Sequence, residues 1–320
     1  MRRKSRRGIF SALILLFALI FAYGGYNYFN QLKIDAQAVA LQKAEEQKKL
    51  EAQKLEEQRK LEEQKKIEEQ KRLELQKKIE EQQKLEEKIR QYLGAKVSKI
   101  GLAYYDVETQ KGFSINGDKY FNAASTVKVQ MNMVLFDLIK EGKLRIDGTV
   151  KYNAGTDYEG GTGILQSKDK TKPIDIQTLS DYSIIYSDNI ATRMIIRTIG
   201  RPEMKRRFGE KVGHTVPQEN LVTPNEELTF LKLLYENKDN NEYYTRLTGI
   251  MKETAFHDRL DKYVPQNIVA HKIGNYGNFV NDAGIIYTPN PYIIAVYTEG
   301  LENANETIAQ INKILYEAHK

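Results

Sequence analysis

Cysteine and tryptophan are absent from this chain of 320 residues, and histidine occurs only four times. Without cysteine the chain has no disulfide framework, no Cys-ligated zinc site and no thiol nucleophile. A phosphate-binding loop is also missing, because the glycine-rich run at 160–163 has no following lysine and no preceding strand, so we expect it to be a flexible connection. The histidines lack the short spacings of zinc ligands, and we expect no metal and no cofactor; they are His214, His257, His271 and His319.

Uncompensated positive charge is confined to the start of the chain. The net charge is +6, and residues 1–33 hold six basic residues and no acidic one, which accounts for the whole excess. A basic pI would otherwise suggest a nucleic-acid partner. Because the remaining residues are neutral in sum, we expect none. The six basic residues are Arg2, Arg3, Lys4, Arg6, Arg7 and Lys33.

An uncharged segment follows the first cluster of basic residues. Residues 8–31 carry no charge, and residues 9–23 are almost wholly apolar. This length is close to the roughly 20 residues that cross a bilayer as a helix. Because basic residues tend to stay in the cytoplasm, the segment predicts a single-pass anchor with the rest of the chain outside the cell membrane. A secretory signal cleaved near residues 22–24 is the alternative, but the tyrosine-rich sequence that follows is a poor cleavage context.

Residues 34–93 are rich in Glu, Lys, Gln and Leu, a composition typical of a coiled coil. Their apolar residues recur every six positions, however, which advances each side chain by about 240° around a helix and leaves no continuous seam. Glutamates lie four residues before basic residues, as in Glu56 and Lys60, and such pairs support a single helix. We therefore predict an extended helical stalk that ends at Gly94. An oligomeric coiled coil that uses Leu50, Leu75 and Ile89 is the alternative.

Residues 94–320 form the third predicted part, a domain long enough to bury its own core. Strands are expected near both of its ends, with helices between them. This order indicates an α+β fold, in which an antiparallel sheet built from both termini carries an inserted helical lobe. Strands are expected over residues 99–107, 112–115, 268–271, 281–287 and 292–297, and helices over 126–140, 176–186, 190–199, 226–235 and 305–319.

Within this domain, Ser125 and Lys128 stand three positions apart at the start of a helix whose sequence has hardly any polar face. Residues with this spacing share one side of a helix, and such an apolar helix is buried. A lysine deprived of water can lose its proton near neutral pH and act as the base for a serine nucleophile. The same spacing occurs at Ser167 and Lys170, but in a polar loop where burial could not tune the lysine, so we interpret that copy as chance.

Two later motifs follow in the same domain: Ser187-Asp188-Asn189 between helices, and Lys272-Ile273-Gly274 at the end of an apolar strand. With Ser125-x-x-Lys128 they follow the order S-x-x-K, S-D-N and K-T-G, so residues 95–320 resemble the penicillin-recognising serine enzymes, and among them the class A β-lactamase family. The resemblance implies a serine hydrolase that cleaves a β-lactam or a D-Ala-type cell-wall amide through an acyl-enzyme. Its substrate would be a β-lactam antibiotic or a peptidoglycan stem peptide, and the catalytic domain would be monomeric.

The resemblance also implies a role for each residue of the first two motifs. Ser125 would be the nucleophile and Lys128 its base. Ser187 would pass a proton to the leaving nitrogen, and Asn189 would hold the substrate amide while touching Lys128. Asp188 is expected to be a buried carboxylate that shapes the loop.

In the third motif, Lys272 would supply positive charge for a substrate carboxylate and for Ser187. Its alternative role is that of an edge-strand lysine that discourages aggregation. Gly274 would let its strand approach the ligand closely. The backbone N–H of Asn275 would join that of Ser125 as an oxyanion hole.

Two departures from the family pattern bear on turnover. Ile273 replaces the threonine of K-T-G and has no hydroxyl for a substrate carboxylate. Residues 200–222 form a short basic segment in which Glu203, Glu210 and Glu219 do not match the E-x-x-L-N pattern that activates the deacylating water. Loss of a general base costs a factor of about 10² to 10⁴ in its step, so deacylation is expected to be slow.

Two further hypotheses remain open. The domain could be a catalytically degenerate penicillin-binding or wall-sensing module displayed on a stalk. It could also be a structural tether in which the stalk matters most.

Overall fold

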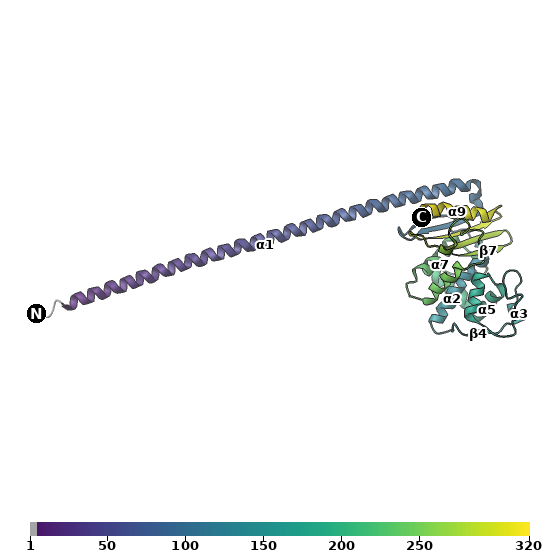
Figure 1. The fold of residues 1–320 in the computed structure, drawn as a ribbon, viewed down its shortest axis with the longest axis horizontal. Helices are drawn as coiled ribbons and strands as arrows, with labels where there is room; N and C mark the ends of the chain where they lie inside the picture. The colour runs from purple at the N-terminus through teal and green to yellow at the C-terminus, as the bar shows by residue number, and fades with distance from the viewer. Residues whose placement is uncertain (1–4) are drawn as a thin grey trace. The chain divides into compact units, whose positions relative to one another are not determined.

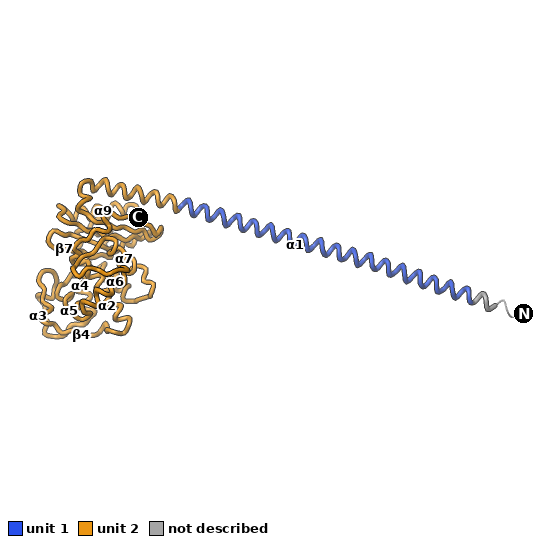
Figure 2. The backbone as a smooth tube through the Cα atoms, turned by 180° about the vertical axis from the view of Figure 1, so that it is seen from behind, with its two compact units in different colours: residues 1–74 blue, residues 75–320 orange. Residues whose placement is uncertain are grey.

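The computed structural model describes residues 5–320 and divides into two compact units, residues 1–74 and 75–320 (Figure 2). The first long element, α1 (Ser5–Leu93), runs without interruption through the first unit and into the second (Figure 1). It ends at Gly94, as predicted, where a φ of +49° breaks the helical geometry. The basic residues expected in the cytoplasm, at positions 2–7, lie outside the residues whose side chains the structure describes.

The part of α1 in the first unit is exposed at nearly every residue whose side chain the structure describes. Its stretch from Phe10 has a mean hydropathy of 1.7 with none of its residues buried, so by length and composition this helix could cross a membrane. Farther along, Leu61 and Ile67 remain about half exposed, at 51% and 47%. Lys60 and Glu56 form one of the predicted ion pairs, at 2.8 Å.

The second unit begins inside α1, earlier than the boundary at residue 93 that the sequence suggested. Leu85, Ile89 and Leu93 are buried, at 9%, 0% and 2% exposure. These three residues recur every fourth position and therefore lie on one side of the helix, unlike the residues of the six-residue repeat before them. The last turns of α1 thus belong to the core of the globular domain.

A five-stranded antiparallel sheet forms the centre of this domain, in the order β2-β1-β9-β8-β7. The prediction that both ends of the domain contribute strands is confirmed, because the first two strands pair with the last three. The strands are β1 (Ile100–Asp106), β2 (Lys111–Ile115), β7 (Val269–Tyr276), β8 (Phe279–Ile286) and β9 (Tyr292–Glu299).

Each face of the sheet packs on a separate hydrophobic core, and strand β9 shows the alternation. Its residues Ile294 and Val296 face a core shared with the end of α1 and with α9 (Ala304–His319). Ile293 and Ala295 face the core of the helical lobe. In Figure 1, α9 accordingly lies on one side of the sheet, and α7 and α2 on the other.

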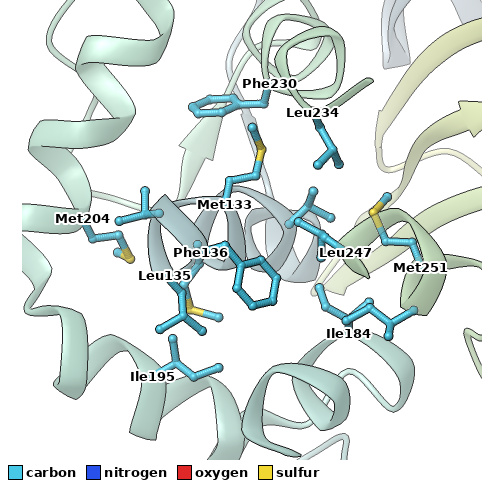
Figure 3. Close-up of a cluster of buried hydrophobic side chains, with 14 of the residues drawn as sticks. Met133, Leu135, Phe136, Ile184, Ile195, Met204, Phe230, Leu234, Leu247 and Met251 are labelled. Carbon is cyan, nitrogen blue, oxygen red and sulfur yellow. The ribbon is translucent and has the colours of Figure 1, made fainter. Parts of the chain in front are cut away.

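The inserted lobe is built around α2 (Val127–Lys140), most of whose side chains are buried. Figure 3 shows Met133, Leu135 and Phe136 of this helix among apolar side chains of neighbouring helices. The other helices are α3 (Ala154–Asp157), α4 (Ile176–Ile185), α5 (Asn189–Ile199), α6 (Arg201–Val212), α7 (Pro224–Glu236) and α8 (Glu242–Lys252). Short strands pair as β3 (Phe121–Asn122) with β6 (Leu221–Val222), and β4 (Thr149–Val150) with β5 (Ile174–Asp175).

Helix α6 is a departure from the prediction, which treated residues 200–222 as one short basic segment without a helix. Pro202 occupies the first turn, and Gly213 ends the helix with a φ of +81°. Met204 and Phe208, four residues apart, are buried against the lobe. Only residues 213–220 remain as a loop, and they lead directly to the functional site.

Candidate active site

Ser125 lies in a tight turn, residues 122–126, that leads into α2, and we call this segment the Ser125 turn. Ala124 has a φ of +50°, a conformation that costs free energy in a residue other than glycine. Its backbone N–H donates to Asn122 Oδ1 at 2.9 Å, and the N–H of Thr126 donates to the carbonyl of Ala123 at 3.1 Å. The strained geometry is therefore held by local hydrogen bonds directly beside the serine.

Two asparagines from distant segments fix the same turn. Asn220 donates from Nδ2 to the Ala124 carbonyl at 3.0 Å, and its own carbonyl accepts from the Ala123 N–H at 2.9 Å. Asn281, on β8, donates from Nδ2 to the Asn122 carbonyl at 2.8 Å. The sequence reasoning did not identify either residue, and no motif in the sequence marks them.

Lys128 lies one helical turn after Ser125 and is buried, at 3% exposure. Burial lowers the pKa of Lys128 to about 8, although the charges of Glu159 and Asp188 oppose the shift. Among the described residues, its Nζ donates to the Ser187 carbonyl at 2.7 Å, to Ser187 Oγ at 3.2 Å and to Asn189 Oδ1 at 2.8 Å, and not to Ser125. Catalytic hydrogen bonds often form only when substrate is bound, so this arrangement is compatible with a base poised between two serines.

The Ser187-Asp188-Asn189 segment joins α4 to α5, and Ser187 has a φ of +52°, a second strained position beside Lys128. Asp188 is buried, as expected, and its two oxygens accept from the backbone N–H groups of Ala191 and Leu165 at 2.9 and 2.7 Å. Asp188 therefore caps α5 and fixes the loop.

The glycine-rich segment 160–163, expected to be a flexible connection, is docked against Asn189. The Asn189 N–H donates to the Thr162 carbonyl at 3.0 Å, and its Nδ2 donates to the Gly160 carbonyl at 2.8 Å. Gly163 has a φ of +128°, and a Cβ there would lie 2.4 Å from Asp188 Cγ. Glycine is required for this close approach, which the sequence showed only as a cluster of small residues.

Strand β7 passes directly over the Ser125 turn at Gly274. A Cβ at Gly274 would lie 2.7 Å from the Ala123 carbonyl oxygen and 3.2 Å from the backbone nitrogen of Ser125. The strand therefore lies close to the Ser125 turn, while its predicted approach to a ligand stays a prediction. Asn275, the next residue, lines the same cavity as Ser125.

Lys272, two residues earlier on β7, is fully buried. Burial and the charge of Lys128 hold the pKa of Lys272 well below its usual value. Its Nζ donates to the carbonyl of Ile273 at 3.1 Å. Although β7 is an edge strand, this side chain does not reach solvent, so the alternative role in blocking aggregation is excluded.

Arg259 is a buried residue near β7 that the sequence reasoning missed. It is 1% exposed, and it donates from Nη2 to Asn275 Oδ1 at 2.6 Å and from Nη1 to the Asn281 carbonyl at 2.7 Å. Both acceptors belong to segments that border the Ser125 turn. Arg259 follows α8 in an irregular stretch, so no periodic pattern of residues marks it.

Two histidines that lie far apart in the sequence converge on Asp261. His257 Nδ1 lies 2.5 Å and His271 Nε2 lies 3.4 Å from Asp261 Oδ2, and His271 Nδ1 lies 2.9 Å from Asp282. Although burial lowers the pKa of His271, the two carboxylates outweigh it and raise that pKa to about 9. His271, Asp261 and Asp282 form a buried ion network, and His257 joins it from the partly exposed side. The described residues contain no group of side chains suited to a metal ion.

Ser125, Lys128, Asn189 and Asn275 line a cavity of about 410 Å³, whereas Ser187, Lys272 and Gly274 are not among its lining residues. Two carboxylates and three cations also line it: Glu159, Glu219, Arg193, Arg201 and Lys205.

The three glutamates of residues 200–222 have different positions. Arg206 and Arg207 hydrogen-bond to Glu203 and hold its pKa at about 2. Arg206 also pairs with Glu210 on the same helix. Glu219 alone among these three lines the cavity.

The second Ser-x-x-Lys copy lies on the surface, as the sequence suggested. Ser167 is exposed, and its Oγ donates to the Ile164 carbonyl at 3.1 Å. Lys170 donates to the carbonyl of Lys168 at 2.7 Å and is not part of any buried site.

Comparisons with known proteins identify the family and the fold of this domain. A model of the beta-lactamase enzyme family matches residues 84–319. A beta-lactamase of Bacillus licheniformis is 28% identical over 254 residues, which cover 69% of this chain and 79% of that protein. Beta-lactamase VEB-1 of Pseudomonas aeruginosa is 25% identical over 237 residues, which cover 65% of this chain and 79% of that protein.

Solved structures with the same fold include PBP-A, with a TM-score of 0.67 at 23% identity over 73% of this chain and 95% of that one. A variant of PBP-A, solved as an acyl-enzyme complex with penicillin G, has a TM-score of 0.67 at 24% identity, and the match covers 74% of this chain and 96% of that one.

Proposed function

Because the chain belongs to the beta-lactamase enzyme family, we propose that it is a membrane-anchored serine hydrolase whose Ser125 forms an acyl-enzyme with a β-lactam or a D-Ala-type cell-wall amide. One juxtaposition carries the proposal: the Ser125 nitrogen lies beneath Gly274, while the buried Lys128 connects Ser187 and Asn189 at the same cavity.

In the proposed reaction, Ser125 Oγ attacks the amide carbonyl carbon, and neutral Lys128 accepts the proton of the hydroxyl. The backbone N–H groups of Ser125 and Asn275 stabilise the developing oxyanion. As the C–N bond breaks, Ser187 passes its hydroxyl proton to the leaving nitrogen and receives in return the proton held by Lys128, which hydrogen-bonds to Ser187 Oγ and becomes neutral again. The product is an ester on Ser125, which water then hydrolyses to regenerate the serine.

Deacylation is proposed to be the slow step. Glu203 and Glu210 are engaged with arginines on α6, away from the cavity lining, and Glu219 reaches the cavity from the loop without the E-x-x-L-N context. A poorly placed general base costs a factor of about 10² to 10⁴ in its step. An acyl-enzyme is therefore expected to accumulate.

The proposed location is the cell membrane, with the catalytic domain outside the cytoplasm. The exposed apolar stretch of α1 from Phe10 supports the anchor. The rest of the proposal does not depend on it, since residues 75–320 form a compact unit.

Intact-mass analysis after incubation with benzylpenicillin tests the proposal as a time course. We expect a gain of one penicillin mass that is lost only slowly, and no gain in Ser125→Ala. Ser167→Ala is the matched control and should label like the unmodified chain. Labelling that persists in Ser125→Ala would contradict the assignment of the nucleophile.

A binding or sensing module is the second candidate, and the buried Ile273 in place of a hydroxyl favours it. The same time course separates the two candidates. A permanent adduct indicates a penicillin-binding module, whereas an adduct that turns over indicates a hydrolase. Substrate loss with no detectable adduct would indicate that deacylation is fast.

A further inference from the structure

A line of buried polar side chains leads from the Ser125 turn into the core of the lobe. Thr126 Oγ1 lies 2.8 Å from the hydroxyl of Tyr297, on β9, and donates to the Ala123 carbonyl at 2.9 Å. Tyr297 donates to Glu227 Oε2, on α7, at 2.8 Å. Gln130, on α2, donates to the same oxygen at 2.6 Å. Three elements distant in sequence thus meet behind the nucleophile.

The side chains of this line are inaccessible to solvent. Thr126, Tyr297 and Glu227 are all 0% exposed. Glu227 Oε1 has no hydrogen-bond partner among the described residues. Burial raises the pKa of Glu227 to about 7, although hydrogen bonds from Tyr297 and Gln130 oppose the shift.

A buried acid of this kind is unfavourable for stability, because replacing such groups by apolar residues of similar volume is often neutral or stabilising. Core packing therefore does not explain Glu227. What the carboxyl does provide is a fixed acceptor for the Tyr297 proton. The single proton of the Thr126 hydroxyl is then shared between the Tyr297 oxygen, at 2.8 Å, and the Ala123 carbonyl, at 2.9 Å.

The Ala123 carbonyl links this line to the catalytic geometry. It accepts from Thr126 Oγ1, it receives a longer hydrogen bond from Asn281 Nδ2 at 3.3 Å, and it lies 2.7 Å from the Cβ position of Gly274. A shift of this carbonyl would move the Ser125 nitrogen relative to β7. Misplacement of a reacting group by about 1 Å can cost on the order of 10²-fold in rate.

We propose that Glu227, Tyr297 and Thr126 are positioning residues, which set the rate of Ser125 acylation by fixing the Ser125 turn from behind without touching substrate. This inference rests on the proposed acyl transfer at Ser125.

Two tyrosines on β9 provide a matched test. Tyr297→Phe removes the hydroxyl that joins Thr126 to Glu227. Tyr292→Phe is the control, since Tyr292 is equally buried but donates to Asn312 Oδ1, at 2.9 Å, on the opposite face of the sheet. The measurement is the rate of benzylpenicillin labelling by intact mass, resolved into apparent affinity and maximal acylation rate, with the folded fraction determined by circular dichroism.

We expect Tyr297→Phe to lower the maximal acylation rate on the order of tenfold with little change in apparent affinity, and Tyr292→Phe to leave both constants unchanged. A merely structural role would lower the thermal stability of both variants and leave the rate per folded molecule unaltered. Equal rates in the two variants would overturn the proposal.

Glu227→Leu and Glu227→Gln separate positioning from stability. The leucine variant should be at least as stable as the unmodified chain and yet acylate slowly, whereas glutamine retains an acceptor and should restore most of the rate. A leucine variant that acylates at the unmodified rate would also overturn the proposal. If the unmodified chain shows neither an adduct at Ser125 nor loss of benzylpenicillin, the acyl-transfer function itself fails, which is a different result from either of these.

Discussion

Two segments of this chain have the same Ser-x-x-Lys spacing, and the structure places them in opposite environments. Lys128 is 3% exposed and contacts Ser187 and Asn189. Ser167 is exposed, and Lys170 donates only to nearby backbone carbonyls. Both segments therefore have the same spacing, but only Ser125 lies beside a buried lysine that could make it nucleophilic.

The difference lies in what other segments contribute. The Ser125 turn is covered by β7 at Gly274 and held by Asn220, whereas residues 167–170 form their hydrogen bonds within their own loop. Desolvation lowers the pKa of an amine, as it does at Lys128. The predictions below test whether this environment, and not the motif, determines reactivity.

The largest difference in labelling rate is expected between the variants that lack the lysine of one or the other Ser-x-x-Lys segment. Lys128→Ala should slow penicillin labelling of Ser125 by about 10² to 10⁴-fold, because a general base contributes a factor of that size. Lys170→Ala should leave the labelling rate unchanged. Both rates are measured by intact mass against time.

Because Lys128 is buried, its removal could also affect folding, and circular dichroism of both variants gives the folded fraction. A Lys128→Ala protein that is folded and labels at the unmodified rate would refute the assigned base.

A smaller effect is expected from crowding the Ser125 turn. Gly274→Ala places a Cβ 2.7 Å from the Ala123 carbonyl oxygen, which must displace either the strand or the turn. We expect the acylation rate to fall by up to about 10²-fold, the lower end of the roughly 10² to 10³-fold loss that removal of one oxyanion-hole donor causes. Gly249→Ala, in α8 with nothing within 4 Å of the new Cβ, is the control and should label normally. Normal labelling by Gly274→Ala would show that β7 need not approach so closely.

The sequence predicted the antiparallel sheet, most helices and the end of α1, because each depends on local periodicity or on a single glycine. The strand prediction over residues 292–297 corresponds to β9, and the helix prediction over 305–319 to α9. It also predicted Ser125, Lys128 and Gly274 as site residues, since all three stand in ordered motifs, and their roles stay predictions. The structure brings these residues to one place, as the motif order implied.

What the sequence could not predict depends on contacts between distant segments. Asn220 and Arg259 lie in irregular segments, and their roles come from partners on other elements. Helix α6 was overlooked because its buried residues, Met204 and Phe208, are few among many basic residues. Residues 160–163 contact Asn189 through their backbone carbonyls. Every residue has a backbone carbonyl, so no side-chain pattern in the sequence could predict this contact.

The pH dependence of labelling is expected to be of moderate size. Only neutral Lys128 can accept the Ser125 proton, and its pKa is lowered to about 8. The acylation rate should therefore rise with pH and level off above about pH 8, and below that pKa it should fall about tenfold for each pH unit. Rates of labelling measured between about pH 6 and pH 9.5 test this sign. A flat profile, or a midpoint near the ordinary lysine value, would indicate that burial does not tune this amine.

The smallest effect on labelling is expected from substitutions of two isoleucines within α1. Both are isoleucines of the same helix, but one is buried and the other is exposed. Ile89 is fully buried in the second unit, whereas Ile67 is 47% exposed in the first. Ile89→Val should lower the free energy of unfolding by about 0.5 to 1.5 kcal/mol, and Ile67→Val should leave it unchanged. Thermal unfolding followed by circular dichroism measures both, and neither variant should alter the labelling rate of folded protein. If the two variants were equally stable, the last turns of α1 would not contribute to the stability of the globular domain. The domain would then begin at Gly94 and not inside α1.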